Sequence, residues 1–228
     1  MASGSSDSPE APDGSDALPP DPQKVKAGKK PPTSQAARKA RPVKKPATYQ
    51  DVLDAPPNMV AEVLGGALYT FPRPASPHGR AASRLGVRLG GPFDSDQGDP
   101  GGWWILDEPE LHMGDDIVVP DLAGWRREHM PDIPDAAYFS QPPDWACEVL
   151  SPSTRALDEG AKKTIYAREG VTHIWHVDPL ARWLAAYALR GGRYALIGKL
   201  AGDAPVSLPP FDAIEFRLDD LWLSPAKP

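Results

Sequence analysis

One run of residues, WACEVLSPSTRALDEGAKKTIY at positions 145–166, limits the fold of this chain more than any other feature. Its first six residues have the apolar, β-rich composition of a buried strand, but Glu148 stands in the middle of them. An ionised carboxylate in a buried strand is costly unless a cation meets it. Because the turn SPST is short, the helix that follows packs back beside the strand and brings Lys162 to Glu148. The run therefore predicts a strand, a turn and a helix that share an acid–lysine pair.

A second carboxylate has a similar setting. Asp121 follows the apolar run IVVP and precedes LAGW, and Pro120 indicates that the strand ends, bends or lies at a sheet edge there. Two strands that present one acid each at one point suit Mg²⁺, which usually takes one or two protein carboxylates. Two simpler interpretations stay open here. Glu148 and Lys162 form a structural ion pair, or Asp121 only caps a turn.

The rest of the pattern alternates short strands with a few helices. A short helix within 47–57, a hairpin at Gly65-Gly66 and a helix over 76–91 come first. Three β-rich runs within 102–125 precede a proline-broken excursion, and a helix is expected at about 158–169. Further strands follow, with a second hairpin at Gly191-Gly192. Strands outnumber the interspersed helices, so we expect an α/β or α+β fold with a mixed sheet.

The composition divides the chain of 228 residues at about residue 46. Residues 1–46 contain no Phe, Tyr or Trp but nine of the 29 prolines, so we expect a disordered tail, acidic first and then basic. The tail holds nine of the 25 Lys and Arg residues and five of the 31 Asp and Glu residues. The remaining domain, 47–228, is therefore strongly acidic. Such a balance argues against a broadly basic surface that coats nucleic acid, and it permits a metal site.

The single cysteine excludes an intrachain disulfide and a zinc site built from several cysteines. Its position in an apolar strand predicts that Cys147 is a small core residue. There is no apolar run long enough to span a bilayer and no hydrophobic core of a signal peptide, so we expect a cytoplasmic protein.

The runs VPDLAGW, PPDWACEVLSPST and LDEGAKKTIYAREGVTHIWHVDP resemble the Uma-type family of bacterial putative restriction endonucleases, within the PD-(D/E)XK nuclease superfamily. The similarity covers roughly residues 47–200 and implies a restriction-endonuclease-like mixed β-sheet core flanked by helices. Pro120-Asp121 matches the PD of the motif and Glu148 its acidic position. The position two residues after Glu148 is Leu150 rather than lysine. The resemblance places that lysine on the following helix, at Lys162.

The resemblance implies metal-assisted hydrolysis of a phosphodiester, with Mg²⁺ or Mn²⁺ as cofactor. Asp121 and Glu148 hold the metal, with Glu62 as a further acidic ligand, and Lys162 orients water or stabilises charge. His78 matches a recurring histidine at the start of a helix, where a hydrogen-bonding role is the simpler interpretation.

Substrate contact is expected from Arg80, Arg84 and Arg88, which recur at every fourth position and form one basic stripe on the helix over 76–91. A solvated helix face explains this stripe equally well. Trp103, Trp104 and Trp125 are candidates for stacking on bases, although tryptophans in strands are usually core residues.

The expected function is that of an endonuclease acting on nucleic acid, with DNA favoured as substrate. The expected partners are nucleic acid and, as an option, a second copy of the chain in a homodimer, with no membrane. The alternative is a catalytically inactive nuclease-like fold that serves as a binding or regulatory module. A glycoside hydrolase that uses Asp121 and Glu148 as acid and base is a third option, disfavoured by Lys162.

Overall fold

The largest element of the fold is a six-stranded mixed sheet in the order β10-β9-β8-β7-β6-β3. The structure is a computed structural model that describes residues 45–95 and 100–223. The strands of this sheet are β3 (Trp103–Asp107), β6 (Leu122–Arg126), β7 (Trp145–Val149), β8 (His173–Asp178), β9 (Trp183–Arg190) and β10 (Arg193–Ala201). The pair β7–β8 is parallel and the other neighbours are antiparallel. The mixed sheet expected from the sequence is confirmed.

Two glycine pairs make the predicted hairpin turns. Gly65 and Gly66 join β1 (Met59–Leu64) to β2 (Ala67–Pro72), and Gly191 and Gly192 join β9 to β10. All four glycines have positive φ, between 57° and 76°. A two-residue turn with positive φ at both positions matches the twist of the strands that it joins, and glycine adopts it without steric cost.

A second, four-stranded sheet has the order β2-β1-β5-β4. Its two shortest strands are β4 (Leu111–Met113) and β5 (Asp116–Val118). Pro120 separates β5 from β6, so the chain leaves the small sheet at Val118 and enters the large sheet at Leu122. The expected strand end at Pro120 is confirmed, and it places Asp121 at the passage from one sheet to the other.

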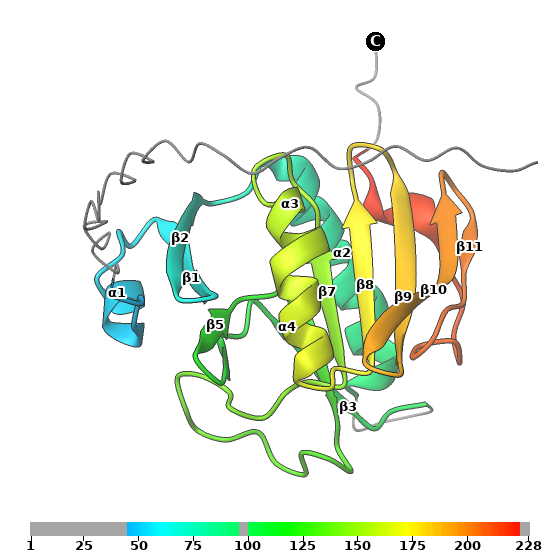
Figure 1. The fold of residues 1–228 in the computed structure, drawn as a ribbon. Helices are drawn as coiled ribbons and strands as arrows, with labels where there is room; N and C mark the ends of the chain where they lie inside the picture. The colour runs from blue at the N-terminus through cyan, green and yellow to red at the C-terminus, as the bar shows by residue number, and fades with distance from the viewer. Residues whose placement is uncertain (1–44, 96–99, 224–228) are drawn as a thin grey trace, which may run out of the picture. The chain divides into compact units, whose positions relative to one another are not determined.

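Helices cover both faces of the six-stranded sheet. α2 (Ser76–Phe93) lies on one face, and the other is crossed by a continuous helical segment of α3 (Arg155–Leu157), the π-helical η1 (Asp158–Lys162) and α4 (Lys163–Arg168) (Figure 1). Leu85 of α2 packs in one core cluster with Cys147 and Val149, whereas Ile165 of α4 packs in the other cluster with Ala146. Alternate residues of β7 therefore face opposite helical layers.

The remaining elements lie at the beginning and at the end of the described chain. α1 (Tyr49–Leu53) begins with a capping box in which Thr48 and Asp51 bond reciprocally. At the other end, β11 (Pro205–Val206), β12 (Phe216–Arg217) and the 3₁₀ helix η2 (Leu218–Leu221) pack on the α2 side of the core. In this arrangement η2 contacts α2 through Arg80 and Arg88.

Four tryptophans of the large sheet are buried in the core, whereas Trp104 and Trp183 are half-buried. Trp103 and Trp125 are buried, and Trp104 donates its indole N–H to the carbonyl oxygen of Met130. Phe211 packs against three tryptophan rings, with centroid distances of 4.8–5.7 Å. This packing leaves the buried tryptophans no free face for stacking on bases. Cys147 is a buried free thiol, as the sequence predicts.

The predicted tail, residues 1–46, lies outside the described residues apart from Lys45 and Pro46. Among the helices that are described, none combines the length and apolarity needed to cross a bilayer.

Candidate active site

A cavity of about 310 Å³ opens where the two sheets and the helical segment α3–α4 meet. Glu62, Asp121, Glu148 and Lys162 all line it. They come from β1, the β5–β6 connection, β7 and η1, so the chain contributes one residue from each of four elements. The structure thus brings Asp121, Glu148 and Lys162, and also Glu62, to one cavity, while their roles stay predictions.

The strand register explains why Asp121 and Glu148 converge. β6 and β7 pair with Leu122 opposite Cys147, and one further step of the same antiparallel register sets Asp121 opposite Glu148. Residues that face each other in this way project on the same side of a sheet. The backbone N–H of Val149 donates to Asp121 Oδ2 at 2.6 Å, which ties the carboxylate to the end of β7.

Glu148 has a partner on each carboxylate oxygen. Lys162 Nζ donates to Oε2 at 2.8 Å and the Tyr166 hydroxyl donates to Oε1 at 2.6 Å. Lys162 and Tyr166 lie one turn apart, so one helical face supplies both donors. The helix thus supplies the buried carboxylate with two hydrogen-bond donors, one charged and one neutral.

Lys162 lies at the centre of a buried acidic cluster. Its Nζ is 3.1 Å from Glu62 Oε1 and 3.6 Å from Asp158 Oδ1, in addition to its contact with Glu148. Burial alone would lower the pKa of the ammonium, but Glu148, Glu62 and Asp158 outweigh burial and raise this pKa well above its ordinary value. Lys162 is therefore a permanently charged group of the cavity.

The carboxylates outnumber the cation that they surround. Burial raises the pKa of Glu148 well above its ordinary value, Lys162 opposes this effect, and the neighbouring acids add to it. Glu62 also accepts a hydrogen bond from the N–H of Val119, the residue after β5, at 2.7 Å, so it is fixed to the β5–β6 connection as well as to Lys162. The acids therefore outnumber the one ammonium group that they surround, and their crowding favours the protonated form of Glu148.

Asp158 belongs to the site although the sequence analysis did not select it. Its side chain is buried, lines the cavity and lies four residues before Lys162 on the π-helical turn. Burial, partly opposed by Lys162, raises its pKa to about 6. The signal available in the sequence was the i, i+4 spacing of Asp158 and Lys162, which places both on one helical face.

His78 holds the other oxygen of Asp121. Its Nε2 lies 3.1 Å from Asp121 Oδ1, while its buried Nδ1 has no hydrogen-bond partner. Burial lowers the pKa of His78, but Asp121 outweighs this and raises the pKa above its ordinary value. The histidine at the start of α2 therefore orients Asp121, together with the Val149 N–H.

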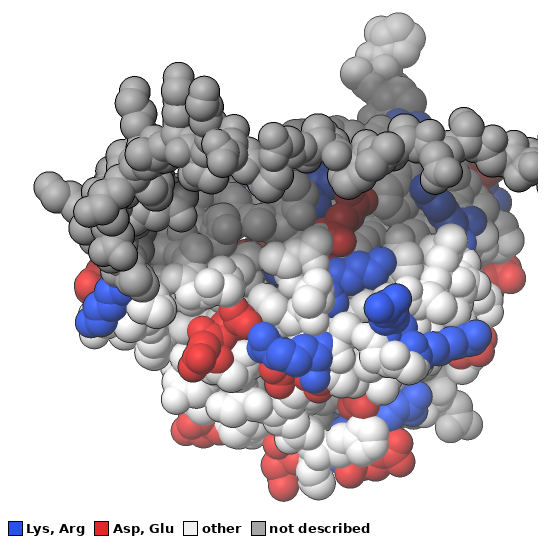
Figure 2. Space-filling model, in the orientation of Figure 1, with Lys and Arg blue, Asp and Glu red and all other residues white. Residues whose placement is uncertain are grey.

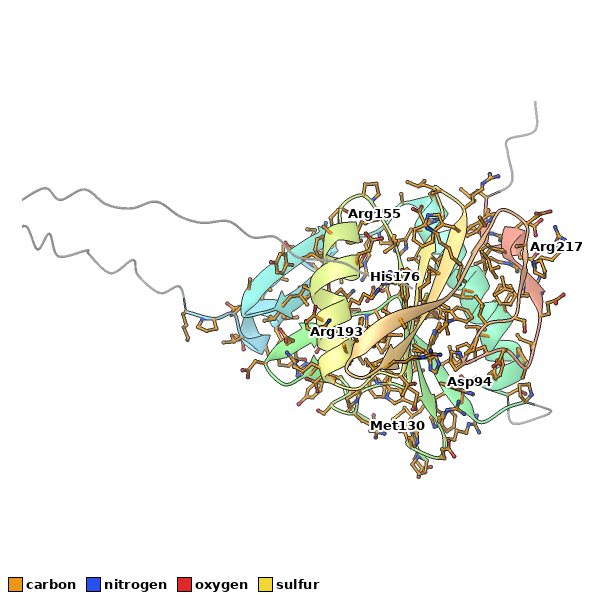
Figure 3. The ribbon with its side chains drawn as sticks, turned by 45° about the vertical axis from the view of Figure 1, so that its right-hand side comes forward. Asp94, Met130, Arg155, His176, Arg193 and Arg217 are labelled. Atoms are coloured by element: carbon orange, nitrogen blue, oxygen red, sulfur yellow. The ribbon has the colours of Figure 1, made fainter. Side chains whose placement is uncertain are left out.

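A second histidine beside Glu148 supplies no charge to the site. His176 of β8 is paired with Glu148 in the parallel register and is buried. Burial and then the repulsion of Lys163 lower its pKa to about 3, so the ring stays neutral at physiological pH. Figure 3 labels His176 on the sheet behind the helical segment that begins near Arg155.

The arginine stripe of α2 does not line the cavity. Arg80 donates to the carbonyl oxygen of Asp220, and Arg88 forms an ion pair with the carboxylate of the same residue. Arg84 has a buried Nε without a hydrogen-bond partner. Two of the three arginines thus bind η2, a segment that carries no periodic signal in the sequence. Their expected contact with nucleic acid stays a prediction.

The donor set fits a hard divalent cation by its chemistry, because three buried or half-buried acids, Glu62, Asp121 and Glu148, share one cavity. In the arrangement described, however, Lys162, Tyr166 and His78 bind oxygen atoms of these acids. Within residues 45–95 and 100–223, no three His, Cys, Asp or Glu side chains are arranged as a metal site. A metal at this cavity would therefore share these oxygen atoms with the present donors or replace them.

The sequence profile of the family Uma2, described as "Putative restriction endonuclease", matches residues 46–219. The chain belongs to this family. The match includes Glu62, Asp121, Glu148 and Lys162 and excludes most of the predicted tail. No curated protein matches the chain.

The solved structures that share the fold of this Uma2-family chain include a putative nuclease. It is described as a putative nuclease belonging to DUF820 from Anabaena variabilis ATCC 29413, with a TM-score of 0.63 and 21% sequence identity. The match covers 77% of this chain and 97% of the other. The likeness confirms the nuclease-like mixed α/β fold expected from the sequence.

Proposed function

We propose that this chain is a metal-dependent endonuclease of the PD-(D/E)XK type that hydrolyses phosphodiester bonds of nucleic acid, with DNA as the favoured substrate. The observation that carries the proposal is the convergence of Asp121, Glu148 and Lys162 on one cavity in a chain that matches the Uma2 family. The family description supports a nuclease; the metal, the substrate and the residue roles are part of the proposal.

Asp121, Glu148 and Glu62 would hold Mg²⁺ or Mn²⁺. When bound, the metal supplies a polarised phosphoryl oxygen and a water of lowered pKa. The protein contributes pre-set ligands: His78 and the Val149 N–H orient Asp121, and the Tyr166 hydroxyl orients Glu148. These hydrogen bonds fix the positions of the two carboxylates before a metal binds.

Lys162 is the proposed electrostatic catalyst. Its ammonium is charged at all relevant pH values, and it lies on the cavity wall beside both Glu62 and Glu148. Once it is released from these acids, it can orient the attacking water or stabilise charge on the transferred phosphoryl group. Asp158 remains one turn away on the same helix and keeps the ammonium at the cavity.

A catalytically inactive nuclease-like module is the second candidate. The observation that favours it is the complete set of protein partners around Glu148 and Asp121, which satisfies both acids without a metal. Such a module would bind nucleic acid and leave it intact.

A cleavage assay separates the two candidates. Labelled single-stranded DNA, duplex DNA and RNA are incubated with the full chain in Mg²⁺, in Mn²⁺ and in EDTA. The nuclease cleaves at least one of them with metal and none with EDTA. Glu148→Gln should abolish cleavage, whereas Glu215→Gln, an exposed acid outside the cavity, should preserve it. Binding without cleavage by the wild-type chain would favour the inactive module.

A further inference from the structure

Arg73 is an exposed arginine at the mouth of the acidic cavity. Its side chain is 59% exposed, and its Nη1 is 2.9 Å from Glu108 Oε2, whose side chain is 43% exposed. Both residues line the cavity. Figure 2 shows acidic and basic side chains interspersed on the part of the displayed face that is not covered by grey atoms.

The backbone on both sides of the mouth is restrained, although the two side chains are exposed. Arg73 lies between Pro72, the last residue of β2, and Pro74, which confines the residue before it to extended conformations. Glu108 has a left-handed backbone, with φ at 46°, and its N–H donates to the carbonyl oxygen of Asp121 at 3.1 Å. A non-glycine residue in this region is uncommon and marks a position under local constraint. The backbones of Arg73 and Glu108 are therefore held in place, while their paired charged groups are exposed to solvent.

Many acids line the cavity, so an anionic ligand needs an accessible cation there to offset their repulsion. The acids that line the cavity are Glu62, Glu108, Asp121, Glu148 and Asp158. Of the described residues that line it, Arg73 and Lys162 have permanently cationic side chains. Lys162 is buried and bound by three acids, whereas Arg73 pairs with a single exposed acid.

We propose that Arg73 is a phosphate-binding residue of the site and that Glu108 occupies it when no phosphodiester is bound. This inference rests on the proposed nuclease function and names a substrate contact that the function does not itself provide. An exposed ion pair is weak, so a phosphate can replace Glu108 as the partner of Arg73. The planar guanidinium binds two phosphate oxygens in parallel, which gives orientation as well as charge. Arg73 would thus position the backbone of the nucleic acid over Asp121 and Glu148.

The proposal predicts opposite effects for the two partners of the ion pair. Arg73→Ala removes the phosphate contact, so the Kd for an oligonucleotide should rise about tenfold, and the slope of log K against log salt should become shallower by about one unit. Glu108→Gln removes the competing carboxylate, so the same Kd should fall. Since a folding defect weakens binding in both variants, it cannot reproduce the pair of results.

The matched control is Arg217→Ala. Arg217 is also 59% exposed and also ion-paired, with Asp203 and Asp219, but it lies on β12 and does not line the cavity. Figure 3 shows Arg217 at the side of the domain away from the β1–β2 hairpin that leads to Arg73. This control measures the effect of removing one exposed positive charge at a distance from the site.

Binding is measured by fluorescence anisotropy with the full chain, labelled single-stranded DNA, duplex DNA and RNA, in EDTA at several salt concentrations. If Arg73→Ala and Arg217→Ala give the same Kd and the same salt slope while the wild-type chain cleaves, the inference about Arg73 is wrong and the nuclease function stands. If the wild-type chain neither binds nor cleaves any of the three nucleic acids, the proposed function fails and the inference fails with it.

Discussion

Replacing Asp158 by asparagine removes one acid from the cluster around Lys162 and keeps the size of the side chain. Asp158 is 3% exposed, and at 3.6 Å it is the most distant of the three acids that contact Lys162. The lysine retains its closer partners, Glu62 and Glu148. The substitution therefore tests a buried charge without leaving the ammonium unpaired.

The pKa of Asp158 determines the sign and the size of the change in unfolding free energy that Asp158→Asn causes. Burial raises it from 3.8 to about 6, so the folded protein binds this proton more tightly than the unfolded chain does. The stability contributed by that proton is complete below about pH 4 and is lost as the pH rises through 6. The shift corresponds to about 3 kcal/mol of unfolding free energy, at 1.36 kcal/mol for each pKa unit. Asparagine is uncharged, so Asp158→Asn avoids the cost of burying an ionised side chain at neutral pH.

The measurement is urea unfolding of the wild type and of Asp158→Asn from pH 4.5 to pH 8, in EDTA. We expect the variant to gain about 2 kcal/mol relative to the wild type across this range, because about a third of the total of about 3 kcal/mol falls below pH 4.5, and most of the gain lies between pH 5 and pH 7. Asp115→Asn, an exposed acid, serves as the control and should follow the wild-type curve. If Asp158→Asn is less stable than the wild type at pH 7.5, the charged aspartate stabilises the site and the reasoning is wrong.

Three further outcomes test other parts of the structure. In EDTA, Glu148→Gln should lower the unfolding free energy by less than the roughly 3–5 kcal/mol expected when a buried charge loses its partner, because Lys162 keeps two other acids. We expect Mn²⁺ to raise the melting temperature of the wild type but not that of this variant. Cys147→Ser places a hydroxyl in an apolar core and should lower the unfolding free energy by about 1–3 kcal/mol in urea. Gly124→Ala should lower it by about 1–3 kcal/mol, because a Cβ there meets two tryptophan rings at 3.2 and 3.3 Å, whereas Gly90→Ala has no neighbour within 4 Å and should raise it by up to about 1 kcal/mol.

The features that the sequence predicts well are those with local causes. The hairpins at Gly65-Gly66 and Gly191-Gly192 follow from the conformational freedom of glycine, and the break at Pro120 follows from its missing N–H. The convergence of Glu148 and Lys162 also follows from a short connection. In each case, a few adjacent residues contain the physical reason for the structure.

The features that the sequence does not predict depend on distant segments. The helix expected at about 158 begins at Arg155 and contains a π-helical turn, which no local propensity indicates. The arginines of α2 meet Asp220, more than 130 residues further along the chain. The role of Asp158 was missed because a carboxylate near a helix start ordinarily looks like a favourable dipole contact. Each of these features is decided by packing that the periodicity of one segment does not contain.

The lysine of the site comes from a helix and not from the strand that carries the glutamate, and this has a consequence for the growing chain. A chain that has been synthesised only as far as β7 contains Glu62, Asp121 and Glu148 but no Lys162. β8, which makes β7 an interior strand, is synthesised after that helix. Under the proposed function, a nascent or truncated chain therefore cannot cleave nucleic acid. Cleavage can start only after the helix has docked on the strands that carry the acids, so the order of synthesis also controls the activity.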